Sequence, residues 1–198
     1  MLTLYHAPRS RSSRVIWLLE ELGAPYEVRL TKIPRQDGSG GIDPDNPHPD
    51  RKVPALVDDG ALITESIAIF LYLTDKFPEA KLAPRVGDPL RGPYLSWLAY
   101  YAGVIEPVLN VEFAGQSENP VFKRAWRGKE DIDARILGAL KAHHFLLSLE
   151  FSAVDILIGS VGHWMRDALP SGKIVDEYLA RVNARPALAR AQAKDGEI

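Results

Sequence analysis

The sequence contains no cysteine among its 198 residues. This absence excludes a disulfide framework, a thiolate-bound metal and any mechanism that uses a cysteine of the protein as its nucleophile. The chain also lacks an apolar run of the roughly 18 residues that a membrane-spanning helix needs, and its first residues begin a strand rather than a signal peptide. We therefore expect a cytoplasmic protein without a membrane partner.

An excess of charge of one sign is lacking too. The 24 basic and 26 acidic residues leave a formal net charge of −2, which gives the chain no general attraction for nucleic acid. The five histidines form no metal-binding motif, and we find no glycine-rich phosphate loop of the mononucleotide or dinucleotide type. We expect neither a metal nor an organic cofactor. The hydrophobic fraction of 46% and the charged fraction of 25% are those of an ordinary globular protein.

The first part of the chain has the pattern of a β-α-β unit. Residues 2–5 alternate in polarity and predict a strand. Apolar side chains at helical spacing follow from Val15 to Leu22, and Gly23 is a suitable residue to end that helix. Residues 26–30 alternate again and predict a second strand. A strand, a helix and a strand in succession favour a parallel pair.

A long loop and a second group of elements follow. Residues 34–51 are rich in proline, glycine and aspartate and predict a loop. Residues 53–57 and 61–63 predict short strands, and the Asp58-Asp59-Gly60 run predicts the tight turn between them. A helix is predicted at about 65–76. The order β-α-β, long loop, β-β-α is that of the thioredoxin fold.

Proline and glycine punctuate residues 77–93, and strand patterns stop there. The later residues have helical patterns at about 93–114, 119–149, 152–168 and 174–193. A β-rich part followed by helices alone favours two domains. We predict an α/β thioredoxin-like domain at residues 1–77, a linker at 78–88 and an all-α domain at 89–198.

Four short motifs occur in order along this pattern: Ser10 before the first helix, Val53-Pro54-Ala55-Leu56, Glu65-Ser66, and Phe151-Ser152-Ala153-Val154-Asp155. Together they resemble the glutathione S-transferase family, and the resemblance covers essentially the whole chain. The segment at residues 10–23, Ser-Arg-Ser-Ser-Arg-Val-Ile-Trp-Leu-Leu-Glu-Glu-Leu-Gly, is similar to serine-type bacterial and fungal members in particular.

The resemblance implies a detoxifying glutathione transferase. Glutathione would be the co-substrate, a small hydrophobic electrophile the second substrate, and a homodimer the assembly. A glutathione-dependent isomerase or dehalogenase would carry the same glutathione-binding motifs, and a non-catalytic transferase-like binding protein is a further alternative. A thiol–disulfide reductase needs an enzyme thiolate, so the absence of cysteine excludes that mechanism.

The resemblance makes Ser10 the catalytic residue. A free thiol has a pKa near 8.5, so the enzyme must stabilise the thiolate of glutathione. A serine hydroxyl can donate a hydrogen bond to the sulfur, and the N-terminus of the following helix favours negative charge. Arg9, Arg11 and Arg14 lie at the same helix end, where positive charge opposes the helix dipole. A bound anion beside them would account for their presence. Ser12 and Ser13 are better interpreted as N-caps of that helix.

The remaining glutathione contacts follow from the same resemblance. Pro54 matches the family's cis-proline, and the backbone of Val53 would pair with the cysteinyl part of glutathione as an added strand. Lys52 would meet the glycyl carboxylate, although a solvated lysine is the simpler interpretation. Ser66 would hold the γ-glutamyl carboxylate at a helix N-terminus, and Glu65 would hold the ammonium group.

Two of these motifs also have a purely structural interpretation. Thr64 could cap the helix that Glu65 opens, with the carboxylate complementing the helix dipole. The run from Ser152 to Asp155 has the form of a capping box before an apolar helix. We interpret this last motif as a folding element and not as a catalytic site.

Aromatic residues concentrate in the first helix of the helical part. Such a stripe is usually core. In the family that the chain resembles, the matching helix faces the cleft. We therefore predict that one or two of five residues line an apolar pocket for the second substrate: Tyr94, Trp97, Tyr100, Tyr101 and Val104.

Overall fold

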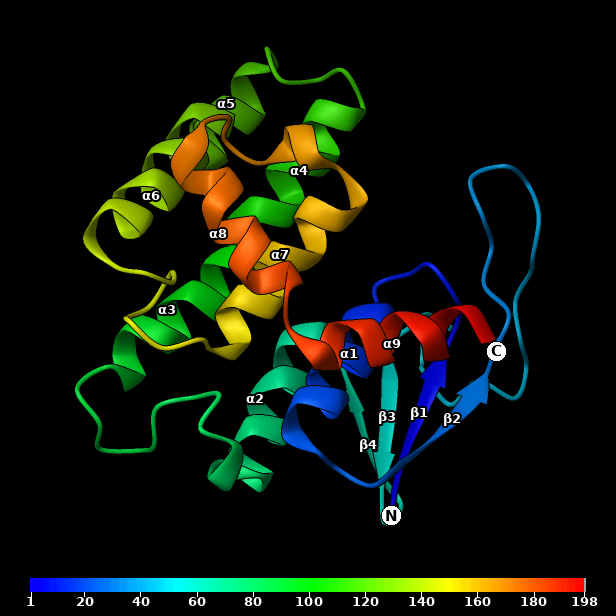
Figure 1. Cartoon of the computed structure of the whole chain (residues 1–198). Coiled ribbons are helices and arrows are strands. Elements are labelled where there is room, and N and C mark those ends of the chain that lie inside the picture. Colours follow the sequence, from blue (N-terminus) through cyan, green and yellow to red (C-terminus); the bar gives the residue numbers. More distant parts are fainter. Residues whose placement is uncertain (198) are drawn as a thin grey trace. The chain divides into compact units, whose positions relative to one another are not determined.

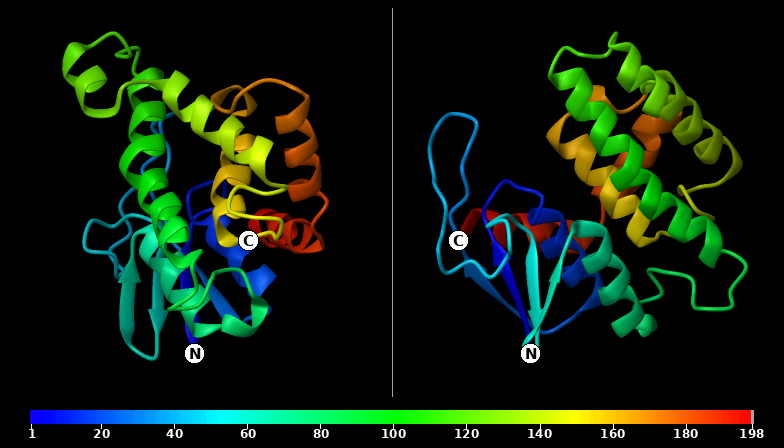
Figure 2. Two further views of the ribbon diagram at one scale, coloured as in Figure 1. Left: turned by 90° about the vertical axis from the view of Figure 1, so that its left-hand side faces the viewer. Right: turned by 180° about the vertical axis from the view of Figure 1, so that it is seen from behind.

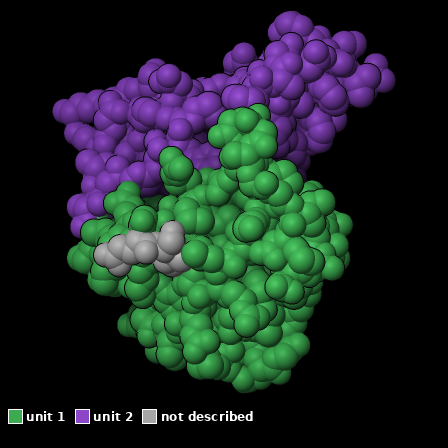
Figure 3. Space-filling model, turned by 90° about the vertical axis from the view of Figure 1, so that its right-hand side faces the viewer, with its two compact units in different colours: residues 1–81, 185–198 green, residues 82–184 purple. Residues whose placement is uncertain are grey.

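A computed structural model describes residues 1–197, which form two compact units (Figure 3). Unit 1 comprises residues 1–81 and the described residues from 185 onward, and unit 2 comprises residues 82–184. The two units are described one at a time. Among the helices of residues 1–197, none combines the length and the apolar character that crossing a lipid bilayer requires.

Unit 1 is built on a four-stranded mixed sheet in the order β2-β1-β3-β4 (Figure 1). The strands are β1 (Leu2–His6), β2 (Tyr26–Leu30), β3 (Ala55–Asp58) and β4 (Ala61–Thr64). β1 and β2 are parallel, whereas β3 pairs antiparallel with both of its neighbours. This topology confirms the thioredoxin-like fold. Val53 and Pro54 lie just before β3, although the sequence pattern had included them in that strand.

The strand register brings several segments to one end of the sheet. Tyr5, near the end of β1, pairs with Ala55, the first residue of β3, and Ala55 also pairs with Thr64, the last residue of β4. β2 ends beside β1, with Leu30 next to His6. The loop after β1, the residues before β3 and the residues after β4 therefore meet at this one end of the sheet.

Helix α1 (Ser13–Leu22) buries its apolar face in the core of unit 1. Leu18 and Leu19 are fully buried, and each such side chain contributes about 1.5–3 kcal/mol relative to exposure. The helix ends at Gly23, whose φ of 63° is left-handed, as expected for a glycine stop. The turn between β3 and β4 also matches the prediction, because Asp59 and Gly60 both have positive φ.

Two other helices belong to unit 1. Helix α2 (Ser66–Lys76) follows β4 and is succeeded by the short 3₁₀ helix η1 (Pro78–Ala80). Helix α9 (Pro186–Glu197) lies beside α1 in Figures 1 and 2, although the two are at opposite ends of the sequence. Its apolar residues Ala187, Leu188 and Ala191 are buried.

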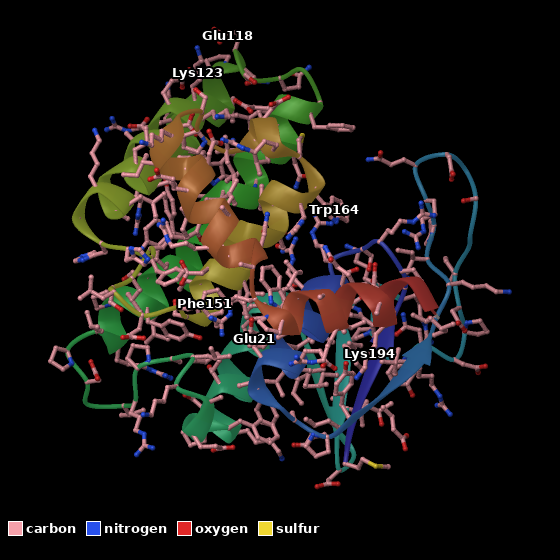
Figure 4. The ribbon with its side chains drawn as sticks, in the orientation of Figure 1. Glu21, Glu118, Lys123, Phe151, Trp164 and Lys194 are labelled. Carbon is pink, nitrogen blue, oxygen red and sulfur yellow. The ribbon has the colours of Figure 1, made fainter. Side chains whose placement is uncertain are left out.

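Charged pairs also join α9 to α1, and Figure 4 labels one charged side chain from each helix, Lys194 of α9 and Glu21 of α1. Arg185, just before α9, donates two hydrogen bonds of 2.6 Å each to the carboxylate of Glu21. Arg190 donates to Glu20 at 2.9 Å, and Lys194 contacts the same carboxylate. These pairs and the buried apolar residues assign α9 to unit 1, whereas the sequence analysis had placed all of residues 89–198 in one helical domain.

Unit 2 is helical, in agreement with the prediction. Its helices are α3 (Arg91–Tyr100), α4 (Glu106–Phe113), α5 (Pro120–Trp126), α6 (Lys129–Ala142), α7 (Ala153–Trp164) and α8 (Lys173–Asn183), with the 3₁₀ helix η3 (Arg166–Ala168). The π-helical segment η2 (Tyr101–Ile105) joins α3 to α4 in one long rod, which is green in Figure 2.

Two helices predicted from the sequence are each divided in the structure. The helix expected at 119–149 breaks between α5 and α6, where Arg127 has a φ of 62° and Gly128 is extended, and it ends at Ala142. The helix expected at 174–193 breaks before Pro186, because the residue that precedes a proline disfavours helical backbone. The helical spacing of apolar residues in the sequence continued across both breaks, so the sequence pattern did not predict them.

The capping box of α7 is present as predicted. The Ser152 N–H donates to Asp155 Oδ2 at 2.9 Å, and the Ser152 hydroxyl donates to the same oxygen at 3.0 Å. The Leu146 N–H and the Tyr178 hydroxyl donate to Asp155 Oδ1 at 3.0 and 3.1 Å. Asp155 is fully buried, so these four bonds fix the start of α7 within the core of unit 2.

Candidate functional site

The loop between β1 and α1 turns two serine hydroxyls inward. Ser10 is 7% exposed and Ser12 is fully buried. The Ser10 hydroxyl lies 2.7 Å from the carbonyl oxygen of Ala7, to which it donates, and 2.7 Å from Ser12 Oγ. Ser10 Oγ also accepts from the Ser12 N–H at 3.2 Å. The predicted catalytic hydroxyl is therefore held at the start of α1 by neighbours on its own loop.

Ser12 does not act as the side-chain cap that the sequence suggested. It occupies the N-cap position of α1, but its hydroxyl makes no capping bond. Instead, Ser12 Oγ lies 2.8 Å from His6 Nδ1 and accepts from the Ala7 N–H at 3.2 Å. The Ser13 hydroxyl donates to Asp195 at 2.6 Å. The side-chain caps predicted at Ser12 and Ser13 do not form, because His6 of β1 and Asp195 of α9 engage the two hydroxyls.

Asp195 of α9 joins the same cluster. One of its carboxylate oxygens accepts from Ser13 and lies 3.2 Å from His6 Nε2, and the other accepts from the Arg9 N–H at 3.2 Å. Burial raises the pKa of Asp195, but its interactions with His6, with the Ser13 hydroxyl and with the Arg9 backbone lower it by more, so that the net pKa is below the usual range. The carboxylate is thus ionised at neutral pH.

Basic side chains surround the same loop. Arg9 and Arg11 are exposed and Arg14 is buried. The guanidinium of Arg35, in the loop after β2, donates to the Pro8 carbonyl at 2.7 Å and to the Arg9 carbonyl at 3.3 Å. Arg35 therefore ties two loops together at this end of the sheet.

The segment before β3 is also held by buried polar side chains. The Val53–Pro54 peptide bond is cis, as expected from the resemblance. Pro54 is buried, Val53 is half-buried and Lys52 is exposed. The amide of Asn46, which is fully buried, donates to the Lys52 carbonyl at 2.9 Å. Asn46 thereby fixes the backbone immediately before Val53.

The segment after β4 differs from the capped helix that the sequence allowed. Glu65, and not Thr64, is the N-cap residue of α2, and no side-chain bond caps that helix. Glu65 has a φ of 68° and is exposed, and Ser66 is half-buried in the first turn. The first N–H groups of a helix without a side-chain cap are available to an anion.

Strained backbone accompanies all three segments. Arg9, Arg51 and Glu65 have φ values of 54°, 55° and 68°. Each lies within two residues of a predicted glutathione contact, and all three are at the same end of the sheet. A non-glycine residue with positive φ costs on the order of 1–3 kcal/mol, and such residues cluster at functional sites. The geometry therefore supports one site formed by these segments.

The five residues predicted to line a second-substrate pocket lie on α3 and η2. Tyr94 is fully buried, and Trp97 and Tyr101 are nearly so, whereas Tyr100 and Val104 are half-buried. The guanidinium of Arg135, on α6, stacks over Tyr100 at 3.8 Å from the ring centroid. Tyr94 thus presents no surface to a ligand in this structure, and the pocket role of the other four stays a prediction.

Unit 2 also has a small hollow elsewhere. It encloses about 80 Å³ among α4, α5 and the start of α6, and its lining includes Val108, Phe122 and Trp126. None of the five residues predicted for the second substrate lines it. The hollow has the volume of a few water molecules at most.

Sequence reasoning missed four residues of the unit 1 site, namely His6, Arg35, Asn46 and Asp195. His6 is the last residue of a strand and lies on the same face as Leu4, so the strand pattern gave no sign of a polar partner. Asp195 lies in the last helix, and nothing local connects it to β1. Asn46 lies in a loop rich in proline, and its burial, which requires hydrogen-bond partners, is evident only in the structure.

The comparisons with known proteins all lead to one family. Residues 4–81 match the family model described as the N-terminal domain of glutathione S-transferase. Glutathione S-transferase GstA of Escherichia coli O157:H7 is 25% identical over 198 residues, which cover 98% of each chain. Glutathione S-transferase 3 of Schizosaccharomyces pombe is 40% identical over 77 residues, which cover 39% of this chain but only 31% of that relative. The crystal structure of a glutathione transferase from Methylococcus capsulatus matches all of both chains, with 28% identity and a TM-score of 0.77.

Proposed function

Because the chain belongs to the glutathione S-transferase family, we propose that it transfers glutathione to small hydrophobic electrophiles, with no further cofactor. The observation that carries the proposal is the meeting of three segments at one end of the sheet. They are the loop that contains Ser10, the Val53–Pro54 bond and the Glu65–Ser66 start of α2. Their strained backbone supports the same conclusion.

Each segment would hold one part of glutathione. The backbone of Val53 would pair with the cysteinyl residue, since Val53 lies two residues before the start of β3. Ser66 and the first N–H groups of α2 would bind the γ-glutamyl carboxylate, and Glu65 would bind the ammonium group. Lys52 would face the glycyl carboxylate.

The thiol would then lie at the start of α1, beside Ser10. Lowering a thiol pKa by two units requires about 2.7 kcal/mol of preferential thiolate stabilisation. A hydrogen bond to a charged group supplies about 1.5–3 kcal/mol. The α1 N-terminus and the arginines of the loop would supply the rest. The thiolate would attack the electrophilic carbon, while the site holds both reactants in position.

A conjugation assay with a general aromatic electrophile tests the proposal. The enzyme should catalyse glutathione-dependent consumption of the electrophile, with saturation in glutathione. S-Methylglutathione keeps the peptide contacts but has no thiol, so it should inhibit competitively without reacting. Turnover that is independent of glutathione, or no turnover together with no glutathione binding by calorimetry, would contradict the proposal.

A further inference from the structure

Four polar side chains form a continuous chain from Ser10 into the interior of unit 1. Ser10 Oγ lies 2.7 Å from Ser12 Oγ, and Ser12 Oγ lies 2.8 Å from His6 Nδ1. His6 Nε2 lies 3.2 Å from Asp195 Oδ1. His6 and Ser12 are fully buried, and the Asp195 side chain is 18% exposed. We call this set the Ser10–Asp195 chain.

The ionised carboxylate of Asp195 determines which atom donates at each hydrogen bond of the Ser10–Asp195 chain. A carboxylate only accepts hydrogen bonds, so the ring nitrogen that faces it is the one that carries a proton. Neutral His6 therefore has its proton on Nε2 and a lone pair on Nδ1. Ser12 then donates to Nδ1, and Ser12 Oγ is left as an acceptor for the proton of Ser10. Ser10 donates inward, either to Ser12 or to the Ala7 carbonyl.

This direction bears on the chemistry of a bound thiol. With its own proton turned inward, Ser10 offers a lone pair at the start of α1. In this state it can accept the S–H group of glutathione, but it cannot donate to a thiolate. A second arrangement, with every proton moved one step inward, makes Ser10 the donor to sulfur and leaves His6 as an imidazolium beside Asp195.

We propose that the thiol proton of glutathione passes along the Ser10–Asp195 chain and stays on His6, an inference that rests on the proposed function. The S–H bond breaks as Ser10 Oγ accepts that proton, Ser10 passes its own proton to Ser12, and Ser12 passes its own to His6 Nδ1. No proton leaves the protein. The thiolate accepts a hydrogen bond from Ser10, and the Asp195 carboxylate balances the imidazolium. Ser12, His6 and Asp195 are positioning residues, because they act through Ser10.

The surroundings of His6 before glutathione binds also support the proposal, whichever way the hydrogen bonds of the Ser10–Asp195 chain run. Nε2 is buried and makes no well-formed hydrogen bond among the described residues, and Asp195 Oδ1 lies 3.2 Å from it. A buried polar atom in this state is unfavourable. Protonation of the ring converts the 3.2 Å contact into an ion pair. Of the arginines around the loop, Arg9 and Arg11 are exposed to solvent, Arg14 is buried and Arg35 donates to the Pro8 and Arg9 carbonyls. Asp195, in contrast, is in direct contact with the ring.

The number of protons released on glutathione binding tests the proposal on the unmodified protein. Calorimetry in buffers of different ionisation enthalpy measures this number, and ultraviolet absorbance measures the bound thiolate at the same pH. S-Methylglutathione reports any protons released by other groups. After the protons released with S-methylglutathione are subtracted, the wild-type protein should form thiolate while releasing almost no protons to the buffer. A release near one proton per thiolate, or binding without thiolate, overturns the proton path but leaves the proposed function in place. Absence of binding overturns both.

Two variants and a control locate the proton acceptor. His6→Gln keeps a polar side chain but cannot hold the proton, so any thiolate still formed should release about one proton to the buffer. Asp195→Asn donates to Nε2 and reverses the tautomer, as in serine proteases that lose their aspartate. It should lower the ratio of bound thiolate to thiol roughly tenfold, the equivalent of one pKa unit. Arg190→Gln removes another contact of α9 with α1, 2.9 Å in length, and should leave both readouts unchanged. Equal effects of Arg190→Gln and Asp195→Asn would show that the role is structural and overturn the proposal.

Discussion

At the scale of single residues, Asp155 gives a test of how burial changes ionisation. Burial raises the pKa of Asp155 to about 6, although four hydrogen bonds to its carboxylate oppose the shift. An aspartate of the unfolded chain has a pKa of about 3.9. The folded state therefore binds this proton more tightly than the unfolded state does. Stability from this group is fully present below about pH 4 and is lost as the pH rises through about 6.

Urea unfolding at several pH values checks this sign. Between about pH 4 and 7, the free energy of unfolding of the wild type should fall by up to about 3 kcal/mol relative to Asp155→Asn, which does not titrate. The variant should also be less stable at every pH, because its amide N–H₂ group faces donors. A difference between the two proteins that stays constant across this range would contradict the raised pKa.

Single residues of the site could be predicted only where a local motif marked them. Pro54 and Glu65 lie at fixed places relative to a strand and a helix, so a short pattern sufficed for both. His6 and Asp195 meet only because α9 returns to α1 from the other end of the sequence. Ser12 shows the same limit, since its position predicts a cap while a buried histidine engages its hydroxyl. Contacts of this kind depend on tertiary packing, which periodicity does not encode.

At the scale of elements, the attachment of α9 should depend on Arg185. Its guanidinium makes two 2.6 Å bonds to Glu21, whose side chain is 5% exposed. In Arg185→Gln the buried carboxylate loses its charged partner, and the free energy of unfolding should fall by about 1.5–3 kcal/mol. Lys173→Ala removes an exposed pair with Glu177 at 3.6 Å and should change stability by no more than about 0.5 kcal/mol. Chemical denaturation measures both, and equal effects would contradict the importance of the buried pair.

The strands of unit 1 and its helices α1 and α2 could be predicted well because each had a clear local signal. Gly23 stopped α1, and Asp59-Gly60 marked the tight turn of the hairpin. The helices of unit 2 were harder, since Arg127 adopts positive φ without being a glycine. The break before Pro186 had a signal in the proline itself, but the continuing apolar pattern outweighed it.

At the scale of the whole molecule, we propose a homodimer in solution, on the basis of the family alone. Light scattering at micromolar concentration should give twice the chain mass of 21.9 kDa. Dilution should raise the monomer fraction without a change in helix content if each chain folds by itself. A mass of one chain throughout would contradict the proposal. The family also leads us to expect a cytoplasmic detoxification role, which the identity of the electrophile would test.

The two-part organisation could be read from the loss of strand patterns near residue 77, and the structure has its boundary at residue 81. The assignment of the C-terminal helix α9 to unit 1 could not be read from the sequence, because its composition resembles that of the preceding helices. Its basic residues were informative only once Glu20 and Glu21 were known to lie opposite. The whole-chain resemblance was recognisable because each motif is local, whereas the site needs the motifs to meet at one end of the sheet.

The central claim is that Ser10 stabilises a glutathione thiolate at the start of α1, and the pH titration of bound thiolate by ultraviolet absorbance tests it most directly. Ser10→Ala should raise the titration midpoint by about one to two pH units and lower turnover roughly ten- to hundredfold, with glutathione affinity nearly unchanged. Ser13→Ala, whose hydroxyl points to Asp195 instead, should have a smaller effect. An unchanged midpoint in Ser10→Ala, with a shift of the same size in Ser13→Ala, would contradict the account.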